Sequence, residues 1–197
     1  MTPERRERIT NVLNNRQPDL TVILENVHDP HNIAAVFRTC DAVGVREIYV
    51  LTTTISRHPP FDQKSSASAA HWLTIHQFED LETCIKAVKE KYTKIFATHL
   101  GTESCSLYDL DLKEPVALVF GNERHGVSDD FLKYCDGNFI IPQVGMVRSL
   151  NISVACAISL YEAFRQRNLA GFYNGTPRIS TEEYNSTALS WKMYDGL

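Results

Sequence analysis

The chain has 197 residues, 43% of them hydrophobic, and a formal net charge of −4 at pH 7. This length predicts one domain with a full hydrophobic core. The mild acidity argues against generic binding of polyanions, so any contact with a nucleic acid must come from a local basic patch. We expect no signal peptide and no membrane span, because no apolar run is long enough. Five scattered cysteines form no CxxC pair and no zinc spacing, which is typical of thiols in a reducing cytoplasm.

The first 19 residues are predicted to form an amphipathic helix that docks one face through Ile9, Val12 and Leu13. Four arginines are concentrated in this segment: Arg5, Arg6, Arg8 and Arg16. Composition favours a solvated helix that caps the domain. The alternative is an arginine-bearing arm that touches a phosphate backbone.

A buried strand at residues 20–25 is followed by a helix that begins at Asp29 and Pro30 and ends at Gly44. Its core face has the helical spacing of Ile33, Val36, Phe37 and Cys40. Asn32 falls in the first turn, near the carboxyl end of the strand, where ligands of open α/β sheets gather. Arg38 lies at the border of the apolar face, and taken alone it indicates a surface arginine paired with Asp41.

Further strands are predicted at residues 47–52, 72–75, 94–98 and 116–120, with helices at 80–91 and 128–134. Continuous apolar strands that alternate with helices are typical of a parallel sheet covered on both faces. The loop at 53–70 is rich in Ser and Pro and is predicted to end in a helical turn. Its Arg57, His58 and Lys64 suit either phosphate contact or plain solvation. His99, at a strand end, is either catalytic or structural.

The last of those strands runs into the turn GNERHG, residues 121–126, in which two glycines let the backbone come close to a ligand. The turn lacks the spacing of nucleotide-binding loops. Glu123 would repel a phosphate, which argues against ATP or NAD here. The carboxylate is expected to accept hydrogen bonds from a ligand or from a neighbouring loop.

Residues 137–167 are predicted to form a strand at 139–141, a loop at 142–148 and a long helix entered at 149–151. Gly145 is expected to permit a backbone course that a Cβ would block. Ser149 and Asn151 are both good N-cap types. The helix is apolar on most sides and must bury more than one face, so a partner subunit is the obvious cover. A plain strand–loop–helix unit of an α/β core is the alternative.

These motifs together resemble the SPOUT methyltransferase superfamily. The match consists of Asn32 and Arg38 after the first strand, Gly121-x-Glu123-x-x-Gly126, and Ile141-Pro142 followed by Ser149-Leu150-Asn151. It covers roughly residues 1–170 in the right order. Within the superfamily, the HDPHN, DAVGV, ATHL and GMVRSLN segments are most similar to the TrmH-type branch that methylates the ribose 2′-oxygen of guanosine 18 in the D-loop of tRNA.

The resemblance implies a parallel-sheet fold with a carboxyl-terminal trefoil knot, a homodimer, and S-adenosylmethionine bound in the knot. It implies a cofactor pocket lined by Thr98, Leu100, Gly121, Ile141 and Leu150. Arg38 would be the catalytic arginine, and Asn32, Glu123, Ser149 and Asn151 would complete the active site. Residues 20–168 would form the methyltransferase domain, with helical extensions at 1–19 and 169–197. A cytoplasmic location and a tRNA partner follow from the same resemblance.

The reaction implied is an in-line attack of a ribose 2′-oxygen on the cofactor's methyl carbon, which needs alignment and activation of a weakly acidic hydroxyl. An arginine side chain, whose pKa exceeds about 12, is rarely neutral at pH 7. We therefore expect Arg38 to stay charged, to hold the adjacent phosphate bidentately and to stabilise the developing alkoxide, while the phosphate or a water takes the proton. No metal is expected to take part.

The tail at 168–197 is short and nearly neutral, whereas tRNA enzymes of this kind often carry a longer or more basic extension. It could pack through Trp191, Met193 and Tyr194 instead. Another tRNA ribose or an rRNA ribose therefore remains an alternative substrate. A non-catalytic RNA-binding protein with the same fold is the alternative from a different class, although it would not need the whole set of site residues. A nicotinamide-dependent or ATP-dependent enzyme fails on the missing phosphate-loop patterns.

Overall fold

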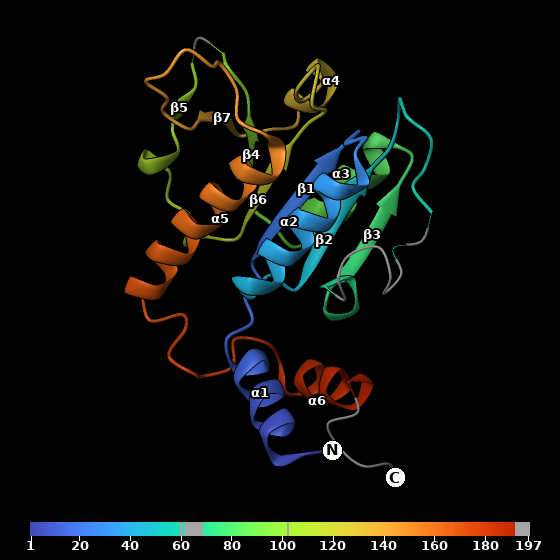
Figure 1. Cartoon of the computed structure of the whole chain (residues 1–197), viewed down its shortest axis with the longest axis vertical. Helices are drawn as coiled ribbons and strands as arrows, with labels where there is room; N and C mark the ends of the chain where they lie inside the picture. The colour runs from blue at the N-terminus through green and yellow to red at the C-terminus, as the bar shows by residue number, and fades with distance from the viewer. Residues whose placement is uncertain (60, 62–68, 102, 192–197) are drawn as a thin grey trace.

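The protein is built on one twisted parallel sheet (Figure 1). The computed structural model describes residues 1–59, 61, 69–101 and 103–191. Within these residues the strand order is β3-β2-β1-β6-β4-β7-β5, and every neighbouring pair is parallel. The strands are β1 (Leu20–Glu25), β2 (Glu47–Leu51), β3 (Thr74–Phe78), β4 (Lys94–Thr98), β5 (Cys105–Ser106), β6 (Val116–Phe120) and β7 (Gly137–Ile140). The predicted α/β class with a parallel sheet is confirmed.

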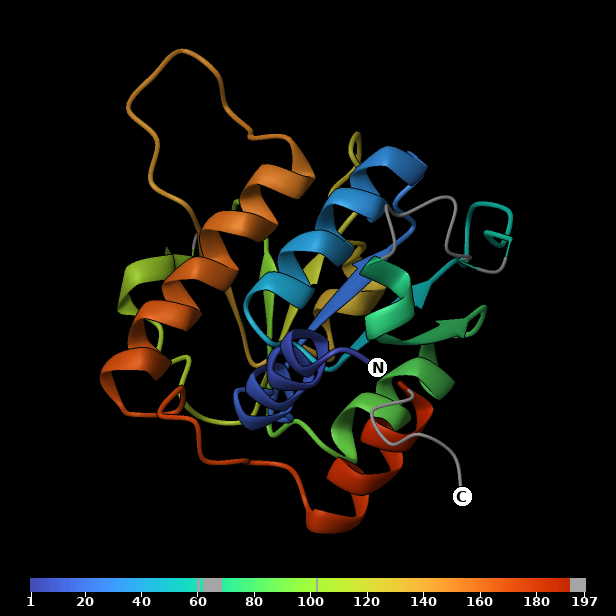
Figure 2. The same cartoon turned by 60° about the horizontal axis from the view of Figure 1, so that its bottom comes forward.

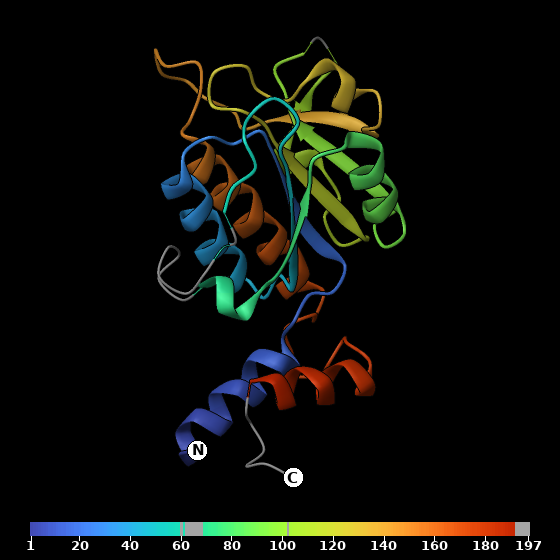
Figure 3. The same cartoon turned by 90° about the vertical axis from the view of Figure 1, so that its right-hand side faces the viewer.

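Helices cover both faces of the sheet, as the apolar strands predict. One face carries α2 (Pro30–Ala42) and α5 (Ile152–Leu169), and the other carries α3 (Leu81–Lys89) and α4 (Asp129–Leu132) (Figure 3). Short 3-10 turns lie at η1 (Ala69–Trp72) and η2 (Leu107–Asp109). Each face has its own hydrophobic cluster, which includes Phe37 and Leu118 on one side and Val119 and Phe131 on the other.

The boundaries of α2 follow from the local sequence. The Asp29 side chain accepts a hydrogen bond of 2.8 Å from the backbone N–H of His31, and Pro30 occupies the first helical position. Gly44 ends the helix with a φ of +80°, and a Cβ there would lie 2.7 Å from the carbonyl oxygen of Asn15. This helix therefore presents Asn32 at the carboxyl edge of the sheet, next to the end of β1.

The long helix α5 is capped by Asn151 rather than by Ser149, because the Asn151 side chain accepts a hydrogen bond of 2.9 Å from the backbone N–H of Ser153. One face packs against α2, which lies beside it (Figure 2). Its other face leaves Val154, Tyr161 and Leu169 exposed by 46%, 53% and 76%. The prediction that α5 has apolar surface beyond what its own sheet buries therefore agrees with the structure.

The two terminal helices, α1 (Pro3–Asn14) and α6 (Thr181–Ser190), lie together below the sheet (Figures 1 and 3). They share a small hydrophobic cluster that includes Leu13, Ala188 and Trp191. Arg16 is 2% exposed and donates hydrogen bonds to the carbonyl oxygens of Val45 and Trp72. Its assignment to a solvated or RNA-facing arm was therefore wrong, because tertiary contacts bury it.

Several predicted boundaries shifted by a few residues. The strand expected at 72–75 runs over Thr74–Phe78, and the one expected at 139–141 runs over Gly137–Ile140. Lys64, Met193 and Tyr194, which the sequence singled out, lie outside the described residues. In the part of the chain that is described, no helix is long and apolar enough to span a bilayer.

Candidate active site

Three loops meet at the carboxyl edge of the sheet: those after β1, after β6 and after β7. The carboxylate of Glu123, in the loop after β6, accepts hydrogen bonds from the Asn32 side chain at 3.1 Å and from the backbone N–H groups of His28 and Asp29 at 3.2 and 3.3 Å. The donors expected for this carboxylate therefore come from the turn between β1 and α2. The three contacts hold that turn against the GNERHG turn.

Asn32 connects this pair to the third loop. Its Nδ2 faces Glu123, and its Oδ1 accepts a hydrogen bond of 3.1 Å from Nδ2 of Asn151. Asn151 in turn uses its own Oδ1 to cap α5. The carboxylate thus fixes which way the Asn32 amide points, and the amide fixes the start of α5.

The hydrogen bonds also set the protonation state of Glu123. Partial burial raises the pKa of this carboxyl, but the hydrogen bonds from Asn32 and from the backbone of His28 and Asp29 outweigh it and hold the pKa below its usual value. Glu123 is therefore ionised at neutral pH. It is an acceptor and a negative charge at this edge of the sheet, not a general acid.

The GNERHG turn closes on its own backbone. Asn122 and Gly126 exchange two backbone hydrogen bonds of 2.8 and 2.9 Å, and a Cβ on Gly121 would lie 2.1 Å from the carbonyl carbon of Gly126. The backbone of the turn therefore leaves no room for a side chain at Gly121, whether or not a ligand is bound. The expectation for Gly145 was wrong, because a Cβ there would meet no atom within 4 Å.

A cavity of about 820 Å³ opens beside this turn, in the size range of small-molecule sites. Its wall includes all five residues that the resemblance assigned to the cofactor, namely Thr98, Leu100, Gly121, Ile141 and Leu150, and it also includes Glu123 and Ser149. Phe120, Phe139 and Ile152 add buried apolar surface. The cavity therefore combines an apolar wall, glycine-bearing backbone and one ionised carboxylate.

This donor set suits S-adenosylmethionine. The apolar wall can hold an adenine ring, backbone groups of the loops can bond its polar edge, and the Glu123 carboxylate complements a positively charged ligand. Arg124 from the same turn and Arg148 from the loop after β7 also line the cavity, so its wall carries charges of both signs. Among the described residues, no group of three His, Cys, Asp or Glu side chains could hold a metal ion.

Two predicted catalytic residues, Arg38 and Ser149, lie outside the Glu123–Asn32–Asn151 chain of hydrogen bonds. Ser149 is exposed and lines the cavity. Arg38 is exposed on α2, six residues beyond Asn32. Its guanidinium has no hydrogen bond or ion pair within residues 1–59, 61, 69–101 and 103–191. The pairing with Asp41 expected from sequence is therefore not formed. Asp41 lies 4.0 Å from Arg16 instead.

Two asparagines at the site escaped the sequence reasoning. Asn26 has a φ of +52° directly after β1, and its Oδ1 accepts hydrogen bonds from the backbone N–H groups of Thr53 and Thr54. Asn122 donates a hydrogen bond of 2.8 Å to the carbonyl oxygen of Asn26. Together they tie the ends of β1, β2 and β6. An asparagine immediately after a buried strand was the available signal, because Asn tolerates left-handed backbone.

The comparisons with known proteins agree with this geometry. A tRNA (guanosine(18)-2′-O)-methyltransferase of Thermus thermophilus is 44% identical over 190 residues, 96% of each chain. The crystal structure of the Aquifex aeolicus TrmH/SpoU tRNA modifying enzyme superposes with a TM-score of 0.86 at 36% identity, covering 95% of this chain and 94% of that one.

A more distant structure carries a ligand. The SpoU methyltransferase AviRb of Streptomyces viridochromogenes, in complex with the cofactor AdoMet, superposes with a TM-score of 0.68 at 26% identity over 77% of this chain and 59% of that one. The sequence profile of the SpoU rRNA Methylase family matches residues 19–161. With that match and the near full-length similarity to the Thermus protein, the chain belongs to the SpoU methylase family.

Proposed function

We propose that this protein is an S-adenosylmethionine-dependent RNA ribose 2′-O-methyltransferase that acts on guanosine 18 in the D-loop of tRNA. The observation that carries the proposal is the Glu123–Asn32–Asn151 chain of hydrogen bonds, whose Glu123 lines the 820 Å³ cavity. It unites the three motif segments at one place. The choice of tRNA rests on the substrate named for the Thermus and Aquifex relatives.

The catalytic roles belong to the proposal. When bound, S-adenosylmethionine supplies an electrophilic methyl group, and the ribose 2′-oxygen is the nucleophile that displaces the thioether. Thr98, Leu100, Gly121, Ile141 and Leu150 line the cofactor site. Glu123 and Asn32 hold Asn151 in place, so that Asn151 and Ser149 orient the ribose at the start of α5.

Arg38 contacts the RNA. Its guanidinium is exposed, so it is available to hold a phosphate next to the methylated ribose and to stabilise the 2′-oxygen as its proton leaves. The proton passes to that phosphate or to a water. Glu123 is not the base in this scheme, because the hydrogen bonds from Asn32, His28 and Asp29 lower the pKa of its carboxyl and so make it a weaker base.

The assembly and the topology are part of the same proposal. A homodimer would cover the exposed apolar side chains of α5, among them Val154, Tyr161 and Leu169. The trefoil knot that the resemblance implies is part of the proposal, and the insertion of β7 between the earlier strands β4 and β5 agrees with it. Residues 20–168 are the methyltransferase domain, with extensions at 1–19 and 169–197, and we propose a cytoplasmic location.

Two measurements test the activity. Isothermal titration with S-adenosylmethionine separates an enzyme from a non-catalytic RNA-binding protein, which has no need of the cofactor. Transfer of a labelled methyl group to unmodified tRNA and, separately, to rRNA then identifies the substrate class. We expect cofactor binding and transfer to tRNA. Transfer to rRNA alone would support the alternative substrate, and absence of cofactor binding would support the non-catalytic alternative.

A further inference from the structure

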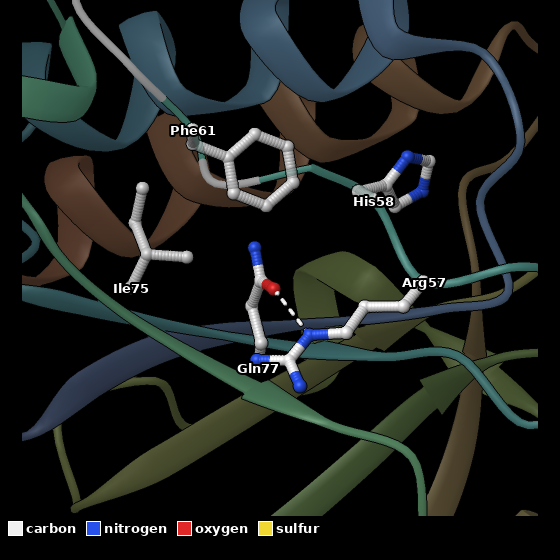
Figure 4. A pocket seen from close by; sticks show the side chains of 5 residues that line it. All are labelled: Arg57, His58, Phe61, Ile75 and Gln77. Carbon is white, nitrogen blue, oxygen red and sulfur yellow. Dashed lines mark hydrogen bonds between the residues drawn. The ribbon is translucent and has the colours of Figure 1, made fainter.

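A second cavity, of about 510 Å³, lies between the loop after β2 and strand β3 (Figure 4). The described residues that line it are Arg57, His58, Phe61, Ile75 and Gln77. Aromatic, aliphatic, amide and guanidinium groups therefore surround one space. This is the combination with which proteins hold an unstacked RNA base, by stacking on a ring and bonding to the base edge.

The groups around this cavity are held in place by their own neighbours. Gln77 accepts a hydrogen bond of 3.0 Å from Nε of Arg57, and Glu79 accepts one of 2.9 Å from its Nη1. The ring of Phe61 stands edge-on to the buried Phe37, with centroids 5.0 Å apart. The guanidinium and the aromatic ring are thus oriented before any ligand arrives, which lowers the entropic cost of binding.

Hydrogen-bond donors remain available at this cavity. The oxygen of the Gln77 amide is occupied by Arg57, so the amide nitrogen is left to donate, and Figure 4 shows it turned toward Phe61. The Nη2 group of Arg57 has no partner in the part of the chain that the structure describes. The cavity therefore keeps two donor groups, one on Arg57 and one on Gln77, and guanine, whose O6 and N7 both accept, is the base that arginine contacts most often.

Residues of this cavity contact the immediate chain neighbours of two candidate site residues. Nε2 of His58 lies 2.8 Å from the carbonyl oxygen of Val27, and the next residue, His28, donates its backbone N–H to Glu123. Phe37, which contacts Phe61, directly precedes Arg38 on α2. A base in this cavity would therefore lie near the ribose that Arg38 and Glu123 serve.

We propose that this cavity binds a guanine base of the RNA substrate, through its O6 and N7 edge, close to the methylated ribose. The proposal rests on the proposed function for its RNA substrate and adds a site that selects the sequence around the target. Gln77 and Arg57 read the base edge, and Phe61 supplies the stacking surface. The cavity thereby helps to decide which guanosine-containing loop is accepted.

The test compares two variants that each remove one cation paired with an exposed carboxylate. Arg57→Gln removes the cation that lines the cavity, and Lys133→Gln removes one paired with Asp130 on α4. For Arg57→Gln we expect a KM for tRNA about 10-fold or more above wild type, with kcat, S-adenosylmethionine affinity and Tm unchanged. Lys133→Gln should match wild type in KM, kcat, S-adenosylmethionine affinity and Tm. Equal KM values for the two variants would overturn the proposal.

A modified RNA identifies the base and separates this inference from the proposed function. tRNA transcripts with single 7-deazaguanosine substitutions in the D-loop should bind wild-type protein more weakly at one position, while Arg57→Gln should not distinguish that transcript from unmodified tRNA. Binding is measured by fluorescence anisotropy, independently of methyl transfer. Loss of the transcript effect in Arg57→Gln, as expected, together with no methyl transfer by the wild-type protein, would sustain the base site and overturn the proposed activity. Methyl transfer without the transcript effect at any position would overturn the base site alone.

Discussion

The side chain of Asn32 donates a hydrogen bond of 3.1 Å to Glu123, although 91 residues separate the two in the chain. Because the carboxylate can only accept, the Asn32 amide must turn its nitrogen toward Glu123 and its oxygen toward Asn151. The ionised carboxylate therefore determines the geometry of two asparagines and of the first turn of α5. On this account Glu123 is a positioning residue.

Glu123→Gln should reduce methyl transfer more than it reduces cofactor binding. His28 and Asp29 donate to different oxygens of the carboxylate, and a glutamine replaces one of these oxygens with an NH2 group, so one of the two backbone hydrogen bonds is lost and the turn after β1 loses part of its anchor. We expect single-turnover methyl transfer to fall by roughly 100-fold, the scale of a small misplacement in an aligned site. The exposed Glu90→Gln is the control. Wild-type rates for Glu123→Gln would show that the carboxylate positions nothing.

Arg38→Lys keeps the positive charge and removes the planar pair of donors. We expect kcat to fall by about two orders of magnitude, the scale of a lost charge-stabilising donor, because a lysine holds a phosphate as a point charge. Affinity for S-adenosylmethionine should be unchanged, since Arg38 does not line the 820 Å³ cavity. Turnover close to wild type would rule out the bidentate role.

Gly121→Ala should prevent the GNERHG turn from closing, because the added Cβ would lie 2.1 to 2.2 Å from backbone atoms of Gly126 and Val127. We expect a lower Tm and loss of S-adenosylmethionine binding by titration calorimetry. Gly145→Ala is the matched control: Gly145 lines the same cavity, and a Cβ there meets nothing within 4 Å. Similar behaviour of the two variants would contradict this account of the turn.

Arg167 is fully buried and joins α5 to the segment before β1. It donates to Asp19 and to the carbonyl oxygen of Leu112 at 2.8 Å, and Arg178 shares the same carboxylate. Arg167→Met should lower the free energy of unfolding by about 3–5 kcal/mol, because it breaks a buried ion pair. Arg165→Met breaks a pair between the exposed Arg165 and the buried Glu162 and should cost less, about 1 kcal/mol, because the Glu162 carboxylate keeps its hydrogen bond from Gln166. Urea titrations of both variants measure the difference.

Glu47 should make stability depend on pH in the acid range. Burial raises the pKa of this carboxyl, but hydrogen bonds from His76, Lys91 and Tyr92 outweigh it and lower the pKa from 4.5 to about 2. A lowered pKa contributes stability that is complete above 4.5 and is lost as pH falls toward 2. The contribution is on the order of 3 kcal/mol.

Urea unfolding of wild type and Glu47→Gln across pH 7 to 2 measures this contribution of Glu47 to the free energy of unfolding. The variant should be less stable at pH 7, and the two free energies of unfolding should approach each other as pH falls through the range from 4.5 to about 2. A gap that stays constant with pH would show that Glu47 keeps its ordinary pKa in the folded protein.

Local sequence patterns predicted the helices and strands that are marked by a cap, a proline, a glycine or an apolar run. The cap at Asp29, the proline after it and Gly44 predicted both ends of α2, and the apolar runs predicted β1, β4 and β6. The two-residue strand β5 has no pattern of its own. The capping box Ser180–Glu183 was an available signal for the start of α6 within the predicted carboxyl-terminal extension.

The site was predictable in composition but not in geometry. Resemblance brought together Asn32, Glu123 and Asn151, and the structure places them in hydrogen-bond contact. Which atom donates to which depends on packing between segments about 100 residues apart. Ser149 and Asn151 are equally good caps by residue type, and only the contact with Asn32 distinguishes them. Arg16 looked like a surface arginine because its carbonyl partners belong to other elements.

The central claim is tested most directly by mapping the methylated atom. Unmodified tRNA transcript is incubated with the protein and labelled S-adenosylmethionine, then digested with nuclease, and the labelled nucleotide is identified. The account predicts label on the ribose 2′-oxygen of guanosine 18 in the D-loop. Label on a base, or no label in a protein that binds the cofactor and the tRNA, would contradict it.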